Sequence, residues 1–239
     1  MQSAKQPLLV VSSFALDKIT YRKSGRVTVK PGGPAFWISR TLQDLGVDFG
    51  ILTGRKKARV EIIVDESGEY GVIRSIGPIK LYKKWGAELI LISTIADEFK
   101  LSEINNLKGD IILDVQGYIR CTKSRNTKFL MPKHIVKRVK VLKATAEEYA
   151  HLETKFIAML GDAIILITKG RDGVDIIERR RKYSLQTPRI QLGPVDAIGA
   201  GDVFLAAFTS QFIRGRETRK AAEFATQYTS QFLHKNKEA

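Results

Sequence analysis

Hydrophobic and polar positions follow two periods along the chain, and together the two periods predict strands that alternate with helices. Short, mostly apolar runs of strand length are typical of buried parallel strands. These runs occupy 7–16, 87–94, 110–115, 138–144 and 162–168. Apolar residues at helical spacing predict helices over 34–46, 200–213 and 217–233. The order of these segments indicates an α/β fold in a single domain spanning residues 1–239.

Two other segments alternate strictly between apolar and polar residues on both sides of a short turn. Residues 19–30 alternate around Ser24-Gly25, and residues 59–75 alternate around Glu66-Ser67-Gly68. Alternation interrupted by a small polar turn is typical of a β-hairpin. The sequence therefore predicts two hairpins in addition to the parallel strands.

Composition is that of an ordinary folded domain, with 44% apolar and 27% charged residues. Cys121 is the single cysteine, so the chain has neither an internal disulfide nor a Cys/His zinc cluster, and a reducing cytoplasm fits best. The run 7–16 has the length of a signal-peptide core, but Asp17 and Lys18 follow at once and no typical cleavage site is present. We interpret it as a buried first strand. No stretch approaches the ~20 apolar residues that span a membrane.

The formal net charge is +15, which brings nucleic acid into consideration as a partner. The densest basic clusters, 54–59 and 178–184, lie at turns or strand edges with little aromatic interleaving. They are unlike a platform on which bases stack. A solvated basic face, which would also attract phosphorylated small molecules, is the preferred interpretation.

Two glycine-rich segments precede predicted helices at positions where ligands of α/β sheets gather. In "VKPGGPAF", Gly32 and Gly33 either form a tight turn or let the backbone approach a bound molecule. In "DAIGAGDVF", small residues leave the N–H groups of a helix N-terminus open to an anion such as phosphate. Asp202 stands directly behind them, where it either complements the helix dipole or removes a proton from a nucleophile beside that phosphate.

"VDAIGAGDVF" resembles the D-T-x-G-A-G-D signature of the ribokinase-like PfkB carbohydrate kinases. Three other segments resemble motifs of that family in the family's order: "PGGPAFWISRTLQDLG" its Gly-Gly segment, "LKATAEEYAHL" its K-x-N-x-x-E region and "ILITKGRDGVDI" its T-x-G-x-x-G nucleotide loop. The resemblance implies a three-layer α/β/α fold with a mostly parallel central sheet and a small β lid made by the hairpins. It implies an ATP- and Mg²⁺-dependent kinase that phosphorylates an alcohol, and we expect a cytoplasmic homodimer that pairs through lid edges.

The resemblance also implies a role for each matching residue. Asp202 would be the catalytic base, and the anion hole would consist of Gly199, Ala200 and Gly201. Residues along the nucleotide would be Thr168, Lys169, Gly170 and Gly173. The acceptor would lie against Asp17, Gly32 and Gly33. Glu148 would organise Mg²⁺ through water.

The chain departs from the family pattern at several positions. Pro34 follows the Gly-Gly pair where Asn is usual, Thr145 replaces the Asn of N-x-x-E, and Ala197 and Ile198 follow Asp196. The acceptor therefore stays open among a sugar, a polyol and a nucleoside. "LDVQGYIR" resembles the D-x-Q-G-x-x-R segment of inositol-kinase-like members, which favours a polyol such as myo-inositol; the alternative is a strand end at which Asp114 and Arg120 pair locally. A nucleic-acid-binding module and a catalytically idle regulator are the remaining alternatives.

Overall fold

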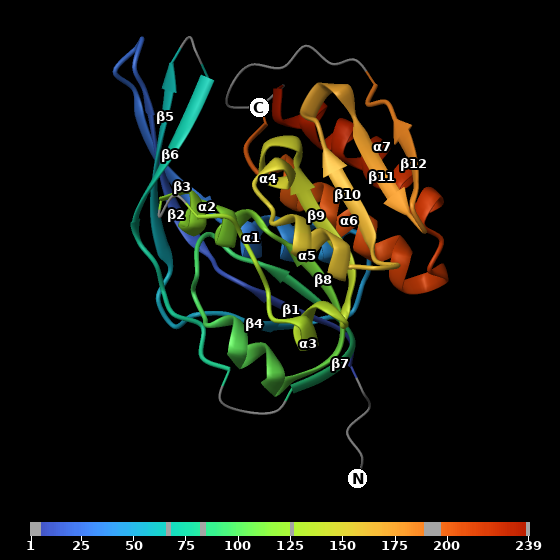
Figure 1. The fold of residues 1–239 in the computed structure, drawn as a ribbon. Coiled ribbons are helices and arrows are strands. Elements are labelled where there is room, and N and C mark those ends of the chain that lie inside the picture. The colour runs from blue at the N-terminus through green and yellow to red at the C-terminus, as the bar shows by residue number, and fades with distance from the viewer. Residues whose placement is uncertain (1–5, 66–67, 82–84, 125–126, 189–196, 238–239) are drawn as a thin grey trace.

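The computed structural model describes residues 6–65, 68–81, 85–124, 127–188 and 197–237. Two β-sheets organise them (Figure 1). The tip of the hairpin predicted at Glu66-Ser67, and Asp196 of the glycine-rich segment, lie outside the described residues. No helix within the described ranges is long and apolar enough to cross a membrane.

The larger sheet has eight strands in the order β12-β11-β10-β9-β8-β7-β1-β4. Neighbours from β4 to β10 run parallel, and β11 and β12 add an antiparallel edge. The strands are β1 (Gln6–Ser12), β4 (Gly50–Leu52), β7 (Trp85–Ser93), β8 (Leu107–Asp114), β9 (Val139–Thr145), β10 (Ile164–Thr168), β11 (Val174–Glu178) and β12 (Arg181–Leu185). This arrangement confirms the predicted mostly parallel central sheet.

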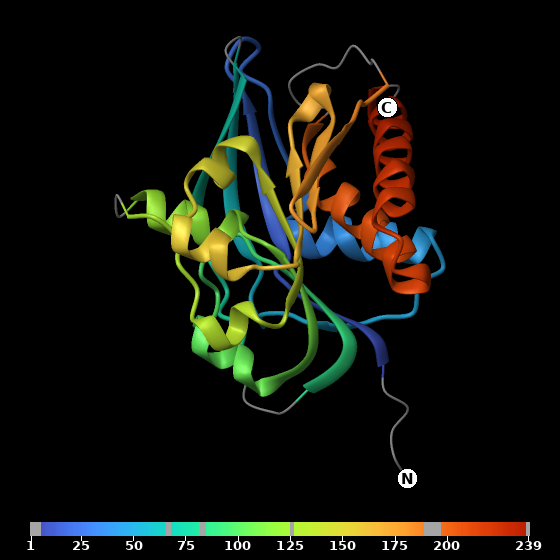
Figure 2. The ribbon, with the colours of Figure 1, turned by 45° about the vertical axis from the view of Figure 1, so that its right-hand side comes forward.

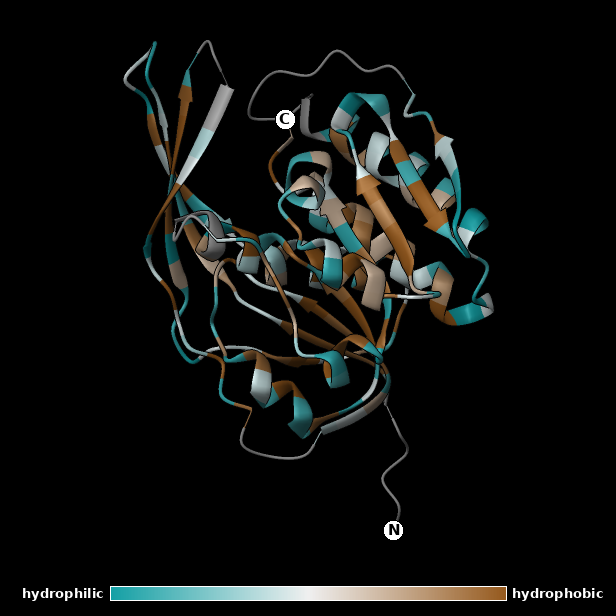
Figure 3. Cartoon of the chain, viewed as in Figure 1, coloured by the Kyte–Doolittle hydropathy of each residue, from teal (hydrophilic) through white to brown (hydrophobic). Residues whose placement is uncertain are grey.

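Helices cover both faces of this sheet, because its strands carry apolar side chains on both faces (Figures 2 and 3). Leu8 and Val10 pack against α1 (Pro34–Asp44), α6 (Ala200–Gly215) and α7 (Thr218–Lys237). Leu9 and Val11 point to the other face. That face is covered by η1 (Leu101–Asn106), α2 (Gln116–Ser124), α3 (Lys133–Val136) and α5 (Thr154–Met159). The result is the predicted three-layer α/β/α arrangement.

The smaller sheet has four strands in the order β3-β2-β5-β6. The strands are β2 (Ala15–Tyr21), β3 (Val27–Gly32), β5 (Ala58–Asp65) and β6 (Gly68–Ser75). Each predicted hairpin is an antiparallel pair, and β2 joins the two hairpins by running parallel to β5. The small sheet stands beside the carboxyl ends of the large sheet's parallel strands (Figure 1).

The predicted first strand, 7–16, is wrong in one respect. The chain leaves the large sheet after Ser12 and enters the small sheet at Ala15. The backbone N–H of Ala58 donates to the carbonyl of Phe14, and the N–H of Ala35 donates to the carbonyl of Ser13. These hydrogen bonds from distant segments fix the backbone between the two sheets. The apolar run 7–16 therefore contributes to both β1 and β2.

Candidate active site

A cavity of about 330 Å³ lies between the small sheet and the carboxyl ends of the parallel strands. It brings together residues from both glycine-rich segments. Gly33 comes from the first segment and Gly199, Gly201 and Asp202 come from the second, and Asp17 of β2 also lines the cavity. The remaining lining residues are Pro34, Trp37, Val60, Ile62, Gly71, Ile95, Gln116, Arg120, Ala197 and Ile198. The cavity therefore joins most of the expected acceptor residues to the expected base and anion hole.

The first turn of α6 lines this cavity. Gly199 is the N-cap in a left-handed conformation (φ 84°), and no side chain caps the helix start. Uncapped N–H groups in a first turn carry partial positive charge and bind anions. Gly199 and Gly201 line the cavity directly, whereas Ala200 contributes the first helical residue without lining it.

Asp202 follows in the same turn, and its carboxyl group has a raised proton affinity. Burial, followed by the Asp114 carboxylate, raises the pKa of Asp202 to about 7 against the lowering effects of Lys143, Arg120 and a hydrogen bond from Ser93. A carboxyl group that titrates near neutral pH is suited to act as a general base. Asp202 thus combines a position in an uncapped helix N-terminus with a proton affinity that suits base catalysis.

A buried ion pair lies behind Asp202. Lys143 Nζ is 3.0 Å from Asp114 Oδ2, and the two side chains are 2% and 0% exposed. Ser93 Oγ lies 3.4 Å from Asp114 Oδ2 and 3.4 Å from Asp202 Oδ1. Burial alone would lower the pKa of Lys143, but the neighbouring carboxylates outweigh it and raise the pKa. Three polar side chains at the ends of β7, β8 and β9 therefore form a hydrogen-bonded cluster beneath α6: Ser93, Asp114 and Lys143.

Asp17 is 4% exposed and lies where β2 pairs with the end of β3. Burial raises the pKa of Asp17 to about 6, against lowering by Lys30 and by the backbone N–H of Gly33. A Cβ on Gly32 would lie 1.8 Å from Asp17 Oδ2, so only glycine leaves room for this carboxylate. Gly33 has φ 81° and packs against the backbone of Ser13 and Ala15. The Gly-Gly pair is a tight turn, and it also shapes the cavity.

The expected nucleotide loop follows β10 at the same edge of the sheet but does not line this cavity. Thr168 pairs in register with Thr145 of β9. Gly170 and Gly173 take the positive φ angles that the turn needs (57° and 88°). Lys169 Nζ is 2.6 Å from Asp175 Oδ1, so its ammonium group is occupied by an internal partner. The loop also carries the exposed side chains of Arg171 and Asp172.

Glu148 closes a capping box at the start of α4 (Ala146–Ala150). Its Oε2 accepts the backbone N–H of Thr145 at 2.7 Å, and Thr145 Oγ1 accepts the N–H of Glu148 at 3.2 Å. Within the described residues, no group of three or more His, Cys, Asp or Glu side chains could hold a metal ion. Glu148, which the sequence predicts to organise Mg²⁺ through water, thus already accepts a backbone N–H at Oε2, and its role toward a metal stays a prediction.

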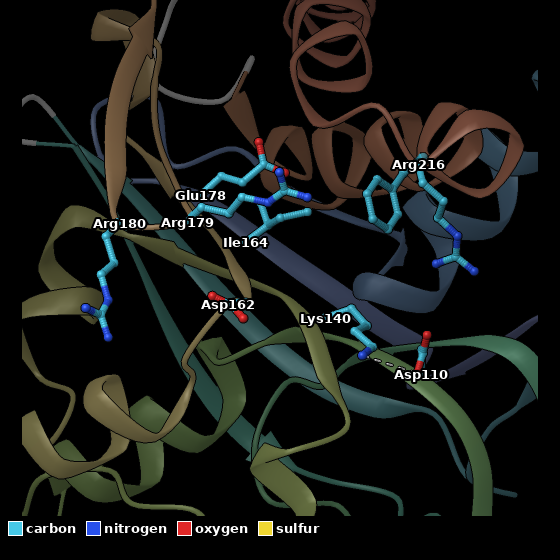
Figure 4. A pocket seen from close by; sticks show the side chains of 9 residues that line it. Asp110, Lys140, Asp162, Ile164, Glu178, Arg179, Arg180 and Arg216 are labelled. Carbon is cyan, nitrogen blue, oxygen red and sulfur yellow. Dashed lines mark ion pairs between the residues drawn. The ribbon is translucent and has the colours of Figure 1, made fainter.

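A larger hollow of about 720 Å³ lies at the opposite edge of the sheet (Figure 4). Asp110, Lys140 and Ile164 line it from the amino ends of parallel strands, and none of the expected site residues does. Its charges are mixed, and Lys140 points toward Asp110 at 4.0 Å (Figure 4). Ligands of open α/β sheets bind at the carboxyl edge, so the smaller cavity is the candidate site.

Sequence reasoning missed the contributions of Lys143, Ser93 and Trp37. Lys143 stands inside an apolar strand pattern, and its place in the K-x-N-x-x-E-like segment is the signal that could have identified it. The alternative of a local Asp114–Arg120 pair is wrong. Asp114 binds Lys143, while Arg120 Nη1 donates to the carbonyl of Ile95 at 3.1 Å.

Residues 123–236 match the model of the pfkB family carbohydrate kinases. A cytidine kinase of Thermococcus kodakarensis is 22% identical over 273 residues, covering 95% of this chain and 96% of the relative.

Two solved structures share the fold. A pyrophosphate-dependent kinase in the ribokinase family, complexed with a pyrophosphate analogue and myo-inositol, has a TM-score of 0.72, 17% identity and coverage of 95% of each chain. An Arabidopsis thaliana ribokinase complexed with ribose and ATP has a TM-score of 0.70 and 17% identity, and the match covers 95% of this chain and 92% of that one. Residues 123–236 thus match the pfkB family of carbohydrate kinases, and the chain as a whole has the fold of the ribokinase structures.

Proposed function

We propose that this protein transfers the γ-phosphoryl group of ATP to an alcohol of a small sugar, polyol or nucleoside, with Asp202 as the base. Asp202 takes the proton of the acceptor hydroxyl as its oxygen attacks the terminal phosphorus. The bond from that phosphorus to its bridging oxygen breaks, and the nucleoside diphosphate leaves. The N–H groups of residues 199–201 stabilise negative charge on the transferring oxygens.

One observation carries the proposal: a single cavity joins Asp17 and Gly33 to a helix N-terminus whose first turn holds Asp202. Repulsion between Asp202 and a bound phosphate would be costly for a purely structural carboxylate. The raised pKa of Asp202, about 7, lets the same group accept a proton near neutral pH.

The acceptor side of the cavity combines polar and apolar walls. Asp17 and Gln116 offer hydrogen-bonding groups, and Trp37, Val60 and Ile62 offer apolar surface. Hydroxyl-rich rings need both, because carboxylate and amide groups bind their hydroxyls while the carbon face rests on apolar surface. Polyols such as myo-inositol, sugars and nucleosides all present these features.

The donor is proposed to lie along Thr168, Lys169, Gly170 and Gly173, next to the Thr145–Glu148 cap. Because the Lys169 ammonium is bound to Asp175, the backbone of this turn would make most of the contacts. A bound Mg²⁺ would neutralise charge on the donor phosphates, with Glu148 orienting its water. Similarity both to an ATP-bound ribokinase and to a pyrophosphate-dependent kinase makes pyrophosphate the competing donor.

The test is a screen of polyols, sugars and nucleosides, each with Mg²⁺ and either ATP or pyrophosphate. We expect acceptor-dependent consumption of one donor, and loss of that consumption in Asp202→Asn. Consumption that is equal in Asp202→Asn would remove Asp202 as the base. A salt-dependent complex with RNA or DNA, without turnover of any acceptor, would favour the nucleic-acid-binding alternative.

A further inference from the structure

Four side chains meet beneath the proposed anion hole, and each comes from a different element. Ser93 ends β7, Asp114 ends β8, Lys143 lies near the end of β9, and Asp202 lies in the first turn of α6. Ser93 Oγ lies 3.4 Å from an oxygen of each carboxylate, so its hydroxyl can donate to either of them, and Lys143 Nζ lies 3.0 Å from Asp114. The backbone N–H of Gln116 donates to the other oxygen of Asp114 at 3.0 Å, which fixes that carboxylate.

Stability alone does not explain why Lys143 lies here. Burying two charges costs desolvation energy, and apolar residues of similar volume often replace a buried pair without loss of stability. The ammonium also lies under the positive end of a helix, because a Cβ on Gly201 would be 3.2 Å from Lys143 Nζ. A cation is unfavourable at a helix N-terminus. A buried cation at this place would attract an anion to the helix N-terminus and would favour the ionised form of the nearby Asp202 carboxyl group.

We propose that Asp114 and Lys143 are positioning residues of the phosphotransfer. Together with Ser93 they fix the orientation of the Asp202 side chain, and their opposite charges set the proton affinity of its carboxyl group. The inference rests on the proposed function, and it adds to that function the residues that control the base. Lys143 supplies attraction for the Asp202 carboxylate, and Asp114 supplies repulsion. Asp114 also keeps the ammonium group of Lys143 in place.

The charges around Asp202 predict opposite effects for the two members of the pair. Asp114 on β8 favours the protonated form of Asp202, while Lys143 on β9 and Arg120 on α2 favour the ionised form. Ser93 on β7 donates to the ionised form, and Glu148 acts on Lys143. Removing Asp114 should therefore lower the midpoint at which Asp202 titrates, and removing Lys143 should raise it.

The experiment is an NMR titration of the full-length protein labelled with [4-¹³C]aspartate, in the absence of substrates. The signal of Asp202 is assigned by its absence from Asp202→Asn. We expect a midpoint lower by about one pH unit or more in Asp114→Asn, and higher by about one pH unit or more in Lys143→Met. The double variant, which lacks both charges, should return toward the wild-type midpoint.

A matched pair on the same two strands serves as the control. Asp110 and Lys140 lie near the opposite ends of β8 and β9 and pair at 4.0 Å. Asp110→Asn and Lys140→Met should leave the Asp202 midpoint unchanged. Asp114→Asn keeps the shape of the side chain, so it tests the inference even if Lys143→Met fails to fold.

The inference would be overturned if the titration midpoint of Asp202 is unchanged in Asp114→Asn, or if it shifts in the same direction in Asp114→Asn and Lys143→Met. The titration needs no acceptor and no turnover, so it is independent of the proposed reaction. A wild-type level of turnover in Asp202→Asn would instead overturn the proposed function while the midpoint shifts could still stand.

Discussion

The ring of Trp37 on α1 packs directly against the backbone of Gly199, the N-cap of α6. A Cβ at Gly199 would lie 2.5 Å from atoms of the indole ring, and its φ of 84° is one that side chains disfavour. Trp37 is 8% exposed, lines the cavity, and meets the rings of Phe36 and Phe232 edge-on. The start of α6 is therefore positioned by a helix that begins at the other glycine-rich segment.

This contact predicts that Gly199→Ala impairs the site. The added methyl group must displace Trp37 or the first turn of α6, at a cost of about 1–3 kcal/mol from strain and displacement. We expect a lower melting temperature and weaker donor binding. Gly215→Ala, at the far end of the same helix, is the control, because a Cβ there would make only an ordinary contact with Glu217 at 3.9 Å. Equal melting temperatures and equal donor affinities for Gly199→Ala and wild type would contradict the prediction.

The fluorescence of Trp37 should change when a ligand binds in the cavity. The chain has two tryptophans, and Trp85 is 40% exposed on β7, away from the cavity lining. In Trp85→Phe, emission therefore comes from Trp37 alone. We expect ATP or pyrophosphate with Mg²⁺ to change this emission with a saturable dependence on concentration. Emission that responds in Trp37→Phe but not in Trp85→Phe would place the binding site elsewhere.

Asp202→Asn should abolish most turnover and leave donor affinity nearly intact. The amide keeps the shape of the side chain but cannot take the acceptor proton, and base catalysis typically contributes roughly 100- to 10,000-fold. Steady-state rates and donor titrations measure the two quantities separately. Turnover within about threefold of wild type would exclude Asp202 as the base. Gly201→Val is the companion, because its side chain would crowd Lys143 and should lower turnover through positioning.

The raised pKa of Asp202 predicts a specific pH dependence of stability. A carboxyl group whose pKa is about 7 in the folded protein binds a proton more tightly there than in the unfolded chain. Its contribution to stability is therefore present below its ordinary pKa and is lost as pH rises through about 7. Because Asp202→Asn removes this loss, the stability of the variant relative to wild type should increase between pH 5 and 8, by at most about 3 kcal/mol.

Urea unfolding of both proteins at the two pH values measures this difference. Asp110→Asn, at an exposed position, should show no such increase. A difference between Asp202→Asn and wild type that is the same at both pH values would mean that the Asp202 carboxyl group titrates normally.

The small sheet predicts a homodimer. Its inner face contributes Asp17, Val60 and Ile62 to the cavity, while apolar side chains on its other face remain 39–59% exposed: Leu16, Val27, Val29, Tyr70 and Val72. Light scattering should give twice the chain mass, and Val29→Glu with Val72→Glu should give the chain mass. A wild-type monomer at micromolar concentration would contradict the prediction.

Local patterns in the sequence were enough to predict most elements. Short, mostly apolar runs identified β7, β8, β9 and β10, because strands buried on both faces carry few polar positions. Pro34 and the glycine-rich segments marked the starts of α1 and α6, since helix starts depend on a few neighbouring residues. The composition of residues 199–202 also pointed to an anion site followed by a carboxylate.

Other features were decided only by the tertiary structure. The run 7–16 is divided between two sheets because segments that lie far away in the sequence bind the backbone at Ser13 and Phe14. Ser93 and Asp202 are 109 residues apart, and they meet only because β7, β8 and β9 end side by side beneath α6. Lys143 is a core position by pattern and becomes an ion-pair partner through the register of β8 with β9, which places Asp114 directly opposite it. Register and strand order depend on long-range packing, and local sequence does not encode them.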